Sequence, residues 1–277
     1  MNDAELHSSH TALRAAACLA IPLALLVALA SLGGIVMPAT YARETASWAA
    51  QGIGQDWVNL LLVVPWLLLT AVLTLRASRP AALLLGGGLV YTLYSYVIYA
   101  FAVHFNALFL VYCVALGLSF FALLLLLRAL LEEDVRAWYG LRAPVRTAGV
   151  LQIAIAVIFA FLWLSEVVPA LVHDRAPASV DAGGFFTNPV HVLDLSILLP
   201  ALALSGVLLL RRRAAGFLLA PLLLGFAVLM AAAIAGMIVL MHQRGVAIDA
   251  SGSIVLGALA LVSAFVLARL LRGMHVP

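Results

Sequence analysis

Lysine is absent from the 277-residue sequence, and only 10% of the residues are charged. About a quarter of the residues of an ordinary soluble domain are charged, so this composition excludes such a domain. Without lysine there is no amine to form a Schiff base with retinal, which excludes a retinal protein. The two cysteines, Cys18 and Cys113, form no Cys-x-x-Cys motif, and we expect them to lie too far apart for a disulfide.

Apolar residues take the place of the missing charge and make up 66% of the sequence. They form runs long enough to cross about 30 Å of hydrocarbon as helices, since each helical residue rises about 1.5 Å. Barrel strands would be shorter and would alternate polar with apolar residues. The sequence therefore predicts an all-α fold, a polytopic membrane helix bundle with eight transmembrane helices, at residues 13–37, 57–75, 81–104, 107–128, 147–171, 189–210, 216–242 and 253–272.

The arginines indicate how this bundle lies in the membrane. With the N-terminus in the cytoplasm, twelve arginines fall on the cytoplasmic side, and only Arg43, Arg175 and Arg244 fall outside. Cytoplasmic loops retain positive charge, so both the N-terminus and the C-terminus are predicted to be cytoplasmic. The net charge of +3 is then a consequence of topology, and we expect contact with membrane lipids and none with nucleic acid.

Two segments that lie 135 residues apart indicate an internal repeat. PWLLLTAVLTLR (Pro65–Arg76) and PALALSGVLLLR (Pro200–Arg211) are identical at seven of twelve positions. Spans one to four and five to eight would then form two parallel four-helix repeats, residues 1–128 and 147–277. Parallel repeats of this kind are typical of transporters.

Two connecting segments have features of their own. Residues 129–146, between the repeats, have apolar residues at helical spacing beside three acidic ones, which predicts a cytoplasmic amphipathic helix. Residues 38–56, on the outer side, predict a short surface helix followed by a flexible turn at Gly52 and Gly54.

The third span combines small and aromatic residues. Its glycine run at 86–88 suits close contact between helices. Further along, Tyr91, Tyr94 and Tyr99 lie near one face of the helix. This face is either the wall of a pocket or a buried set of tyrosines with satisfied hydroxyls.

Polar residues inside the spans are the candidates for a functional site, because ionisable groups are costly to bury in lipid. The repeat aligns Asp56 with His191 and Asn59 with Asp194, so each half carries a polar pair three residues apart on one helix face. With the predicted topology, nearly all ionisable groups within the spans lie near the outer face of the membrane. The candidate ligand-binding residues are Asp56, Asn59, His104, Asn106, Glu166, His191 and Asp194.

Three classes of function fit these residues. The first is a non-enzymatic protein whose outward-facing intramembrane polar pocket binds or transports a small molecule. The second is a metal-dependent membrane enzyme that acts on a lipid or headgroup at the outer leaflet, with a divalent transition metal as its cofactor. The third is an accessory subunit whose polar residues contact a partner protein.

Metal binding depends on imidazole and carboxylate ligands drawn from separate helices. The sequence has no His-x-x-x-His or Glu-x-x-His pair that would place two ligands on one helix face. A haem held between His104 and either His191 or His242 is a further alternative. The candidate metal ligands are His104, Glu166, His191 and Asp194.

Three motifs resemble those of known proteins: QGIGQDW at 51–57, YAFAVHFN at 99–106 and NPVHVLDLSILLP at 188–200. They are similar to motifs of a family of uncharacterised bacterial multi-pass membrane proteins. The resemblance implies a multi-pass protein of the bacterial cytoplasmic (inner) membrane. It implies no activity, cofactor or site assignment.

Overall fold

The computed structural model describes residues 3–140, 143–246 and 251–275, and the elements within these ranges are helices. Eight helical spans in this part of the chain are long and apolar enough to cross a membrane, which confirms the predicted multi-pass helical fold. The spans are α1 (Asp3–Val36), the continuous α2 (Ala46–Val58), η2 (Asn59–Val63) and α3 (Val64–Leu75), α4 (Arg79–Ala102), α5 (Phe109–Leu131), α6 (Val145–Val172), the continuous α8 (Pro189–Leu193), η4 (Asp194–Leu198) and α9 (Leu199–Leu210), α10 (Ala214–Gln243) and α11 (Ser251–Arg272).

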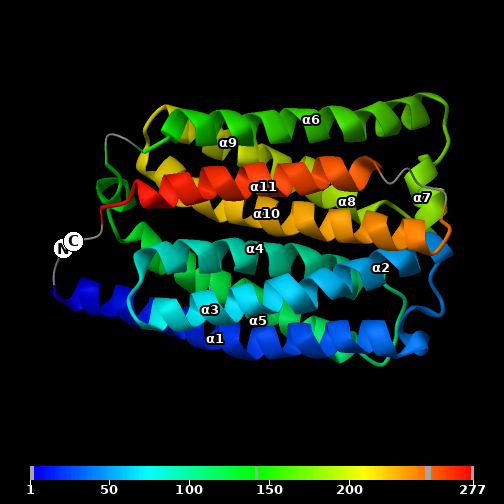
Figure 1. The fold of residues 1–277 in the computed structure, drawn as a ribbon, viewed down its shortest axis with the longest axis horizontal. Coiled ribbons are helices and arrows are strands. Elements are labelled where there is room, and N and C mark those ends of the chain that lie inside the picture. The colour runs from blue at the N-terminus through cyan, green and yellow to red at the C-terminus, as the bar shows by residue number, and fades with distance from the viewer. Residues whose placement is uncertain (1–2, 141–142, 247–250, 276–277) are drawn as a thin grey trace.

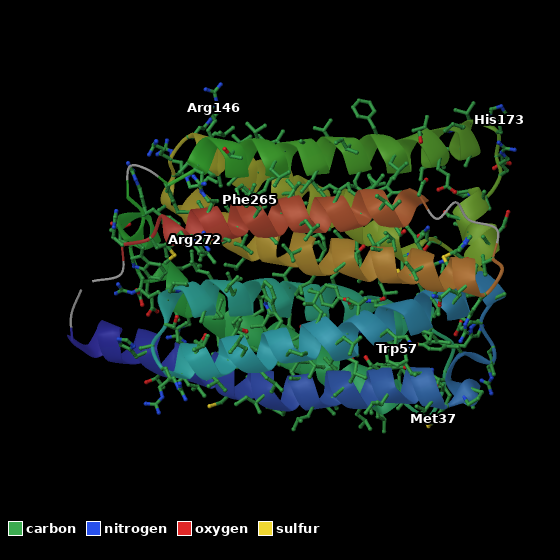
Figure 2. All side chains as sticks on the ribbon, viewed as in Figure 1. Met37, Trp57, Arg146, His173, Phe265 and Arg272 are labelled. Carbon is green, nitrogen blue, oxygen red and sulfur yellow. The ribbon has the colours of Figure 1, made fainter. Side chains whose placement is uncertain are left out.

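Three short elements connect the spans: η1 (Pro38–Tyr41), η3 (Val135–Trp138) and α7 (Ala178–Gly183). Helix α1 begins and helix α11 ends at one end of the bundle, here called the terminal end, and α7 lies at the other, here called the α7 end (Figure 1). Helices α4 and α10 contact each other at the centre, while α1 and α6 lie at opposite edges (Figure 1). Arginines such as Arg146 and Arg272 gather at the terminal end, and Trp57 and His173 lie toward the α7 end (Figure 2).

Glycines allow the central helices to approach closely. A Cβ atom added at Gly87 of α4 would lie 2.9 Å from the Cα of Gly225 on α10, so the two backbones touch. A Cβ atom at Gly54 of α2 would lie 2.7 Å from the Cα of Met237 and 2.8 Å from the carbonyl oxygen of Gly236, both on α10. The expectation that the glycine run at 86–88 serves helix contact is therefore confirmed.

The predicted flexible turn at Gly52 and Gly54 is wrong. Helix α2 begins at Ala46, where Thr45 caps it by accepting a hydrogen bond from the backbone N–H of Trp48, and continues through both glycines into the membrane span. The glycines are part of the helix because α2 packs against α10 at Gly54, and the side chain of Tyr41 fills the space beside Gly52. Contact between helices, and not chain flexibility, accounts for these two residues.

The predicted amphipathic helix at 129–146 is also wrong. Between α5 and α6 the described residues form only η3, a single 3₁₀ turn. Its apolar residues Val135 and Trp138 are buried in the protein, with the guanidinium of Arg79 5.0 Å from the centre of the Trp138 ring. The backbone N–H of His275 donates to the carbonyl oxygen of Trp138 at 2.7 Å. Val135 and Trp138 therefore pack on this protein instead of lying on the lipid.

Two π-helical segments interrupt the second and sixth spans at matching places. Each starts at a candidate site residue, Asn59 in η2 and Asp194 in η4, and each is followed closely by a proline, Pro65 or Pro200. A proline lacks the N–H of a regular helix, and its ring clashes with the carbonyl four residues earlier, so a wider turn accommodates it. The two segments begin 135 residues apart, the same offset as the sequence repeat.

Candidate functional site

The carboxylate of Asp56 is enclosed by tyrosines. Asp56 is only 1% exposed. The hydroxyl of Tyr41 donates to one carboxylate oxygen at 2.6 Å, and the hydroxyl of Tyr99 donates to the other at 2.9 Å. Burial, and then the neighbouring Asp56 carboxylate, raise the pKa of the Tyr41 phenol well above its usual value, so this phenol stays protonated and donates. A Cβ atom at Gly34 would overlap the Asp56 carboxylate, so α1 closes the remaining side. The described residues around Asp56 thus leave no space for a ligand beside it.

Asn59, one helical turn after Asp56, also accepts a hydrogen bond from a buried tyrosine. The hydroxyl of Tyr91 donates to its side-chain oxygen at 2.7 Å. The amide nitrogen of Gln55 donates to Tyr91 at 3.2 Å and to the hydroxyl of Ser95 at 3.0 Å. Because buried polar groups are stable when hydrogen-bonded, this network explains the polar pair of the first half as a packing feature between α2 and α4.

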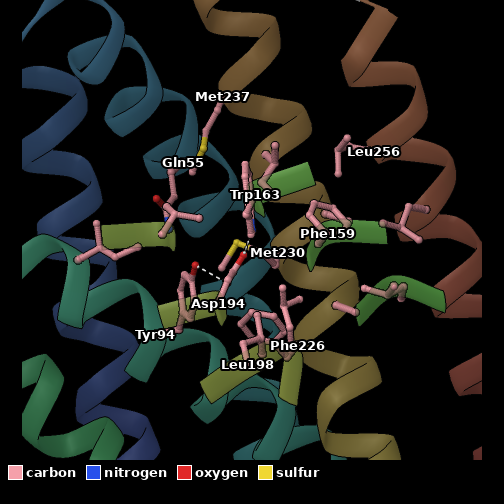
Figure 3. A pocket seen from close by; sticks show the side chains of 18 of the residues that line it. Gln55, Tyr94, Phe159, Trp163, Asp194, Leu198, Phe226, Met230, Met237 and Leu256 are labelled. Atoms are coloured by element: carbon pink, nitrogen blue, oxygen red, sulfur yellow. Dashed lines mark hydrogen bonds between the residues drawn. The ribbon is translucent and has the colours of Figure 1, made fainter. Parts of the chain in front are cut away.

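Asp194 has a different environment. It is 5% exposed and accepts two hydrogen bonds, from the hydroxyl of Tyr94 at 2.9 Å and from the indole N–H of Trp163 at 2.7 Å (Figure 3). Both donors are neutral, and no ion pair involves Asp194 within the described residues. A carboxylate has about four acceptor positions, so Asp194 can accept further hydrogen bonds.

A cavity of about 190 Å³ lies beside Asp194, between the two halves of the bundle. Its walls come from α2, α4, α6, α10, α11 and the span that contains η4. They are mainly aromatic, aliphatic and thioether side chains, and Asp194 is the only acidic or basic residue among the described residues that line it. The residues around the carboxylate include Tyr94, Phe159, Trp163, Leu198, Phe226 and Met230 (Figure 3).

Glu166 and His191 lie next to this site. His191 Nε2 is 3.5 Å from Glu166 Oε2, is buried and makes no hydrogen bond, while the His191 ring packs on the ring of Trp163 with centroids 4.8 Å apart. The other oxygen of Glu166 accepts the backbone N–H of Ser179 in α7 at 2.7 Å. Glu166, His191 and Asp194 therefore belong to one region, in which Trp163 contacts both the imidazole and the aspartate.

The remaining candidates hold the loops at the α7 end. The backbone N–H of His104 donates to Glu44 at 2.7 Å, and the His104 ring lies 3.0 Å from the same carboxylate. Asn106 accepts the backbone N–H of Leu108 at 2.8 Å. Of the four candidate metal ligands, His104 therefore pairs with Glu44, away from Glu166, His191 and Asp194. The described residues contain no cluster of three or more His, Cys, Asp or Glu side chains that could hold a metal ion.

The sequence pattern alone did not identify Trp163 or the cavity walls on α10. Trp163 lies three residues before Glu166, on the same face of α6, so helical spacing from a known candidate was the signal that could have found it. Phe226 and Met230 are four residues apart on α10, but an apolar pair in an apolar span has no distinguishing pattern. Only their position opposite Asp194 makes them part of the site.

Comparisons of this chain with protein-family models, with curated proteins and with solved structures gave no match. The carboxylate of Asp194, its two neutral donors and the cavity beside it are the features from which a function can be inferred. They combine one buried acceptor with an aromatic enclosure. That combination can hold a molecule.

Proposed function

We propose that the cavity beside Asp194 binds a small, mostly apolar molecule that carries one protonated amine. The observation that carries the proposal is a buried carboxylate in apolar walls whose two partners are neutral. A buried charge is costly unless it is paired with an opposite charge, and a bound ammonium group would supply that pairing. Its N–H groups would use the acceptor positions that Tyr94 and Trp163 leave free.

The walls support the same choice of ligand. A cation near an aromatic face gains about 0.5–2 kcal/mol from the ring quadrupole, and Trp163, Phe159 and Phe226 provide such faces. A cavity of about 150 Å³ in a protein core accommodates benzene, so a single-ring amine is of suitable size for this one. An anionic molecule of the same shape would meet the Asp194 carboxylate without a compensating cation.

We also propose that the protein lies in the bacterial cytoplasmic membrane with the terminal end inside. The positive-inside distribution of arginine supports this orientation, which puts Asp194 in the outer half of the membrane. The matching positions of η2 and η4 support a duplication of two four-helix units. In a duplicated bundle, transport would follow from rocking of the halves around a ligand held between them.

Binding to purified protein tests the proposal with benzylamine, benzyl alcohol and benzoate, which share one shape and differ in charge. We expect benzylamine to bind most tightly. Hydrogen bonds to charged groups contribute about 1.5–3 kcal/mol, so Asp194→Asn should weaken benzylamine binding by about 10- to 100-fold and leave benzyl alcohol binding nearly unchanged.

A matched control is Asp181→Asn, which removes a carboxylate from α7 without altering the cavity lining. This variant should bind all three compounds as the wild type does. If Asp194→Asn keeps the wild-type affinity for benzylamine, the proposed function is wrong.

A further inference from the structure

We infer that the ligands of this site are amphiphilic amines with one alkyl chain, and that the chain extends into the bilayer between α6 and α11. This inference rests on the proposed function, because it places the amine at Asp194. The boundary between α6 and α11 is here called the α6–α11 seam. It is the part of the cavity wall that faces lipid.

The seam is built by two helices that barely touch. Helix α6 packs along α9, and α11 packs along α10, but α6 and α11 make few contacts with each other. In the first half of the bundle α1 and α5, which occupy the corresponding places in the proposed repeat, pack together closely. Ile155 and Phe159 of α6 and Leu256 and Leu259 of α11 line the cavity from the two sides of the seam.

The helix behind the seam reflects this open packing. The centrally placed α10 is almost completely buried from Phe217 to Leu229. From Met230 to Leu240, however, most of its residues are partly exposed, although neighbouring helices surround it. Met230 and Ile234 in this stretch line the cavity. The exposure is explained if the cavity continues outward between α6 and α11.

Packed side chains close the cavity toward the α7 end. Trp48 lines it there, and its indole N–H donates to the carbonyl oxygen of Ala102 at 3.1 Å. The ring of Phe185 meets Trp48 edge-on with centroids 4.6 Å apart. The hydroxyl of Thr45 donates to the carbonyl oxygen of Ala182 at 2.8 Å and fixes α7 above α2. At the seam, by contrast, the described residues of α6 and α11 make few contacts with each other.

The outer surfaces of α6 and α11 are apolar, which suits contact with an alkyl chain. Phe161 is 73% exposed on α6, and Ile254 is 75% exposed on α11. Each CH₂ group gains about 0.8 kcal/mol when it moves from water into hydrocarbon. An alkyl chain that stays among the lipid chains while the amine is bound would keep this gain. The charged amine would then lie at Asp194 and the tail among the lipid chains.

The experiment compares 4-hexylbenzylamine with benzylamine on protein in lipid nanodiscs. Affinities are referred to the concentration of each probe in the lipid, which is measured on protein-free discs. We expect wild-type protein to bind the hexyl compound at least as tightly as benzylamine. Leu256→Trp should fill the seam and weaken binding of the hexyl compound by about tenfold or more, with a smaller effect on benzylamine.

Leu261→Trp is the matched control, because Leu261 is 74% exposed on the same helix and does not line the cavity. It should change the affinity for neither probe. Leu259→Trp repeats the test from a second lining position if Leu256→Trp does not fold. If wild-type protein binds benzylamine but rejects the hexyl compound, the seam inference is wrong and the proposed function stands. If benzylamine binds equally to wild type and to Asp194→Asn, the proposed function itself fails.

Discussion

Replacing Gly54 with alanine tests whether the contact between α2 and α10 holds the two halves together. The added Cβ atom would lie 2.7 Å from the Cα of Met237 and 2.8 Å from the carbonyl oxygen of Gly236. Carbon atoms in contact prefer about 3.5–4.0 Å, so the helices must separate by about 1 Å, and backbone atoms cannot rotate away as a side chain can. Overpacking of this kind costs about 1–3 kcal/mol.

Two other glycines calibrate the measurement. A Cβ atom at Gly117 of α5 meets nothing within 4 Å. Gly117→Ala should therefore raise the free energy of unfolding by about 0.5–1 kcal/mol, because alanine loses less backbone entropy than glycine when it folds into a helix. A Cβ atom at Gly236 meets Cγ2 of Val58 at 2.6 Å, a side-chain atom that can move, so Gly236→Ala should be intermediate. The free energy of unfolding can be measured by titrating SDS into mixed micelles. It should be highest for Gly117→Ala, lower for Gly236→Ala and lowest for Gly54→Ala. Equal stability of Gly54→Ala and Gly117→Ala would refute the close contact.

Three further substitutions test the polar contacts. Tyr99→Phe leaves the buried Asp56 with one donor and should lower the free energy of unfolding by about 1–3 kcal/mol; no loss in a detergent melting experiment would contradict the network. Trp163→Phe keeps an aromatic wall but removes the indole N–H that donates to Asp194, so the melting temperature without ligand should fall. Benzylamine can replace this donor, so it should raise the melting temperature of the variant more than that of the wild type. An equal rise in both proteins would contradict this role of Trp163. Thr45→Val removes the cap of α2 and the bond to α7, and should cost about 0.5–2 kcal/mol and speed hydrogen exchange in the first turn of α2; unchanged exchange would show that the cap is not used.

Much of the fold could be predicted from the sequence, because a bilayer leaves few choices to an apolar chain. Backbone groups in hydrocarbon must bond within the segment, so runs of this length form helices. Glycine was harder to interpret. Gly54 has the same identity whether it ends a helix or brings two helices together, and the contact with Gly236, far away in the sequence, decides between the two.

The candidate site was predicted in part. Helical spacing and the cost of burying charge identified Asp56, Glu166, His191 and Asp194 as unusual residues. Their hydrogen-bond partners could not be predicted, since Tyr94 lies 100 residues from Asp194 in the sequence. The same tertiary contacts distinguish the two aspartates, because tyrosines enclose Asp56 whereas Asp194 lies beside a cavity.

The most direct test of an amine site at Asp194 is to locate a heavy-atom ligand in the protein. Crystals soaked with 4-bromobenzylamine, with data collected at the bromine absorption edge, should show one anomalous peak in the cavity between Phe159, Phe226 and Met230, with the amine within hydrogen-bond distance of the Asp194 carboxylate. Asp194→Asn crystals treated in the same way should show a much weaker peak. A cavity without bromine in the wild-type crystals, or a peak of equal height in the variant, would contradict the proposed function.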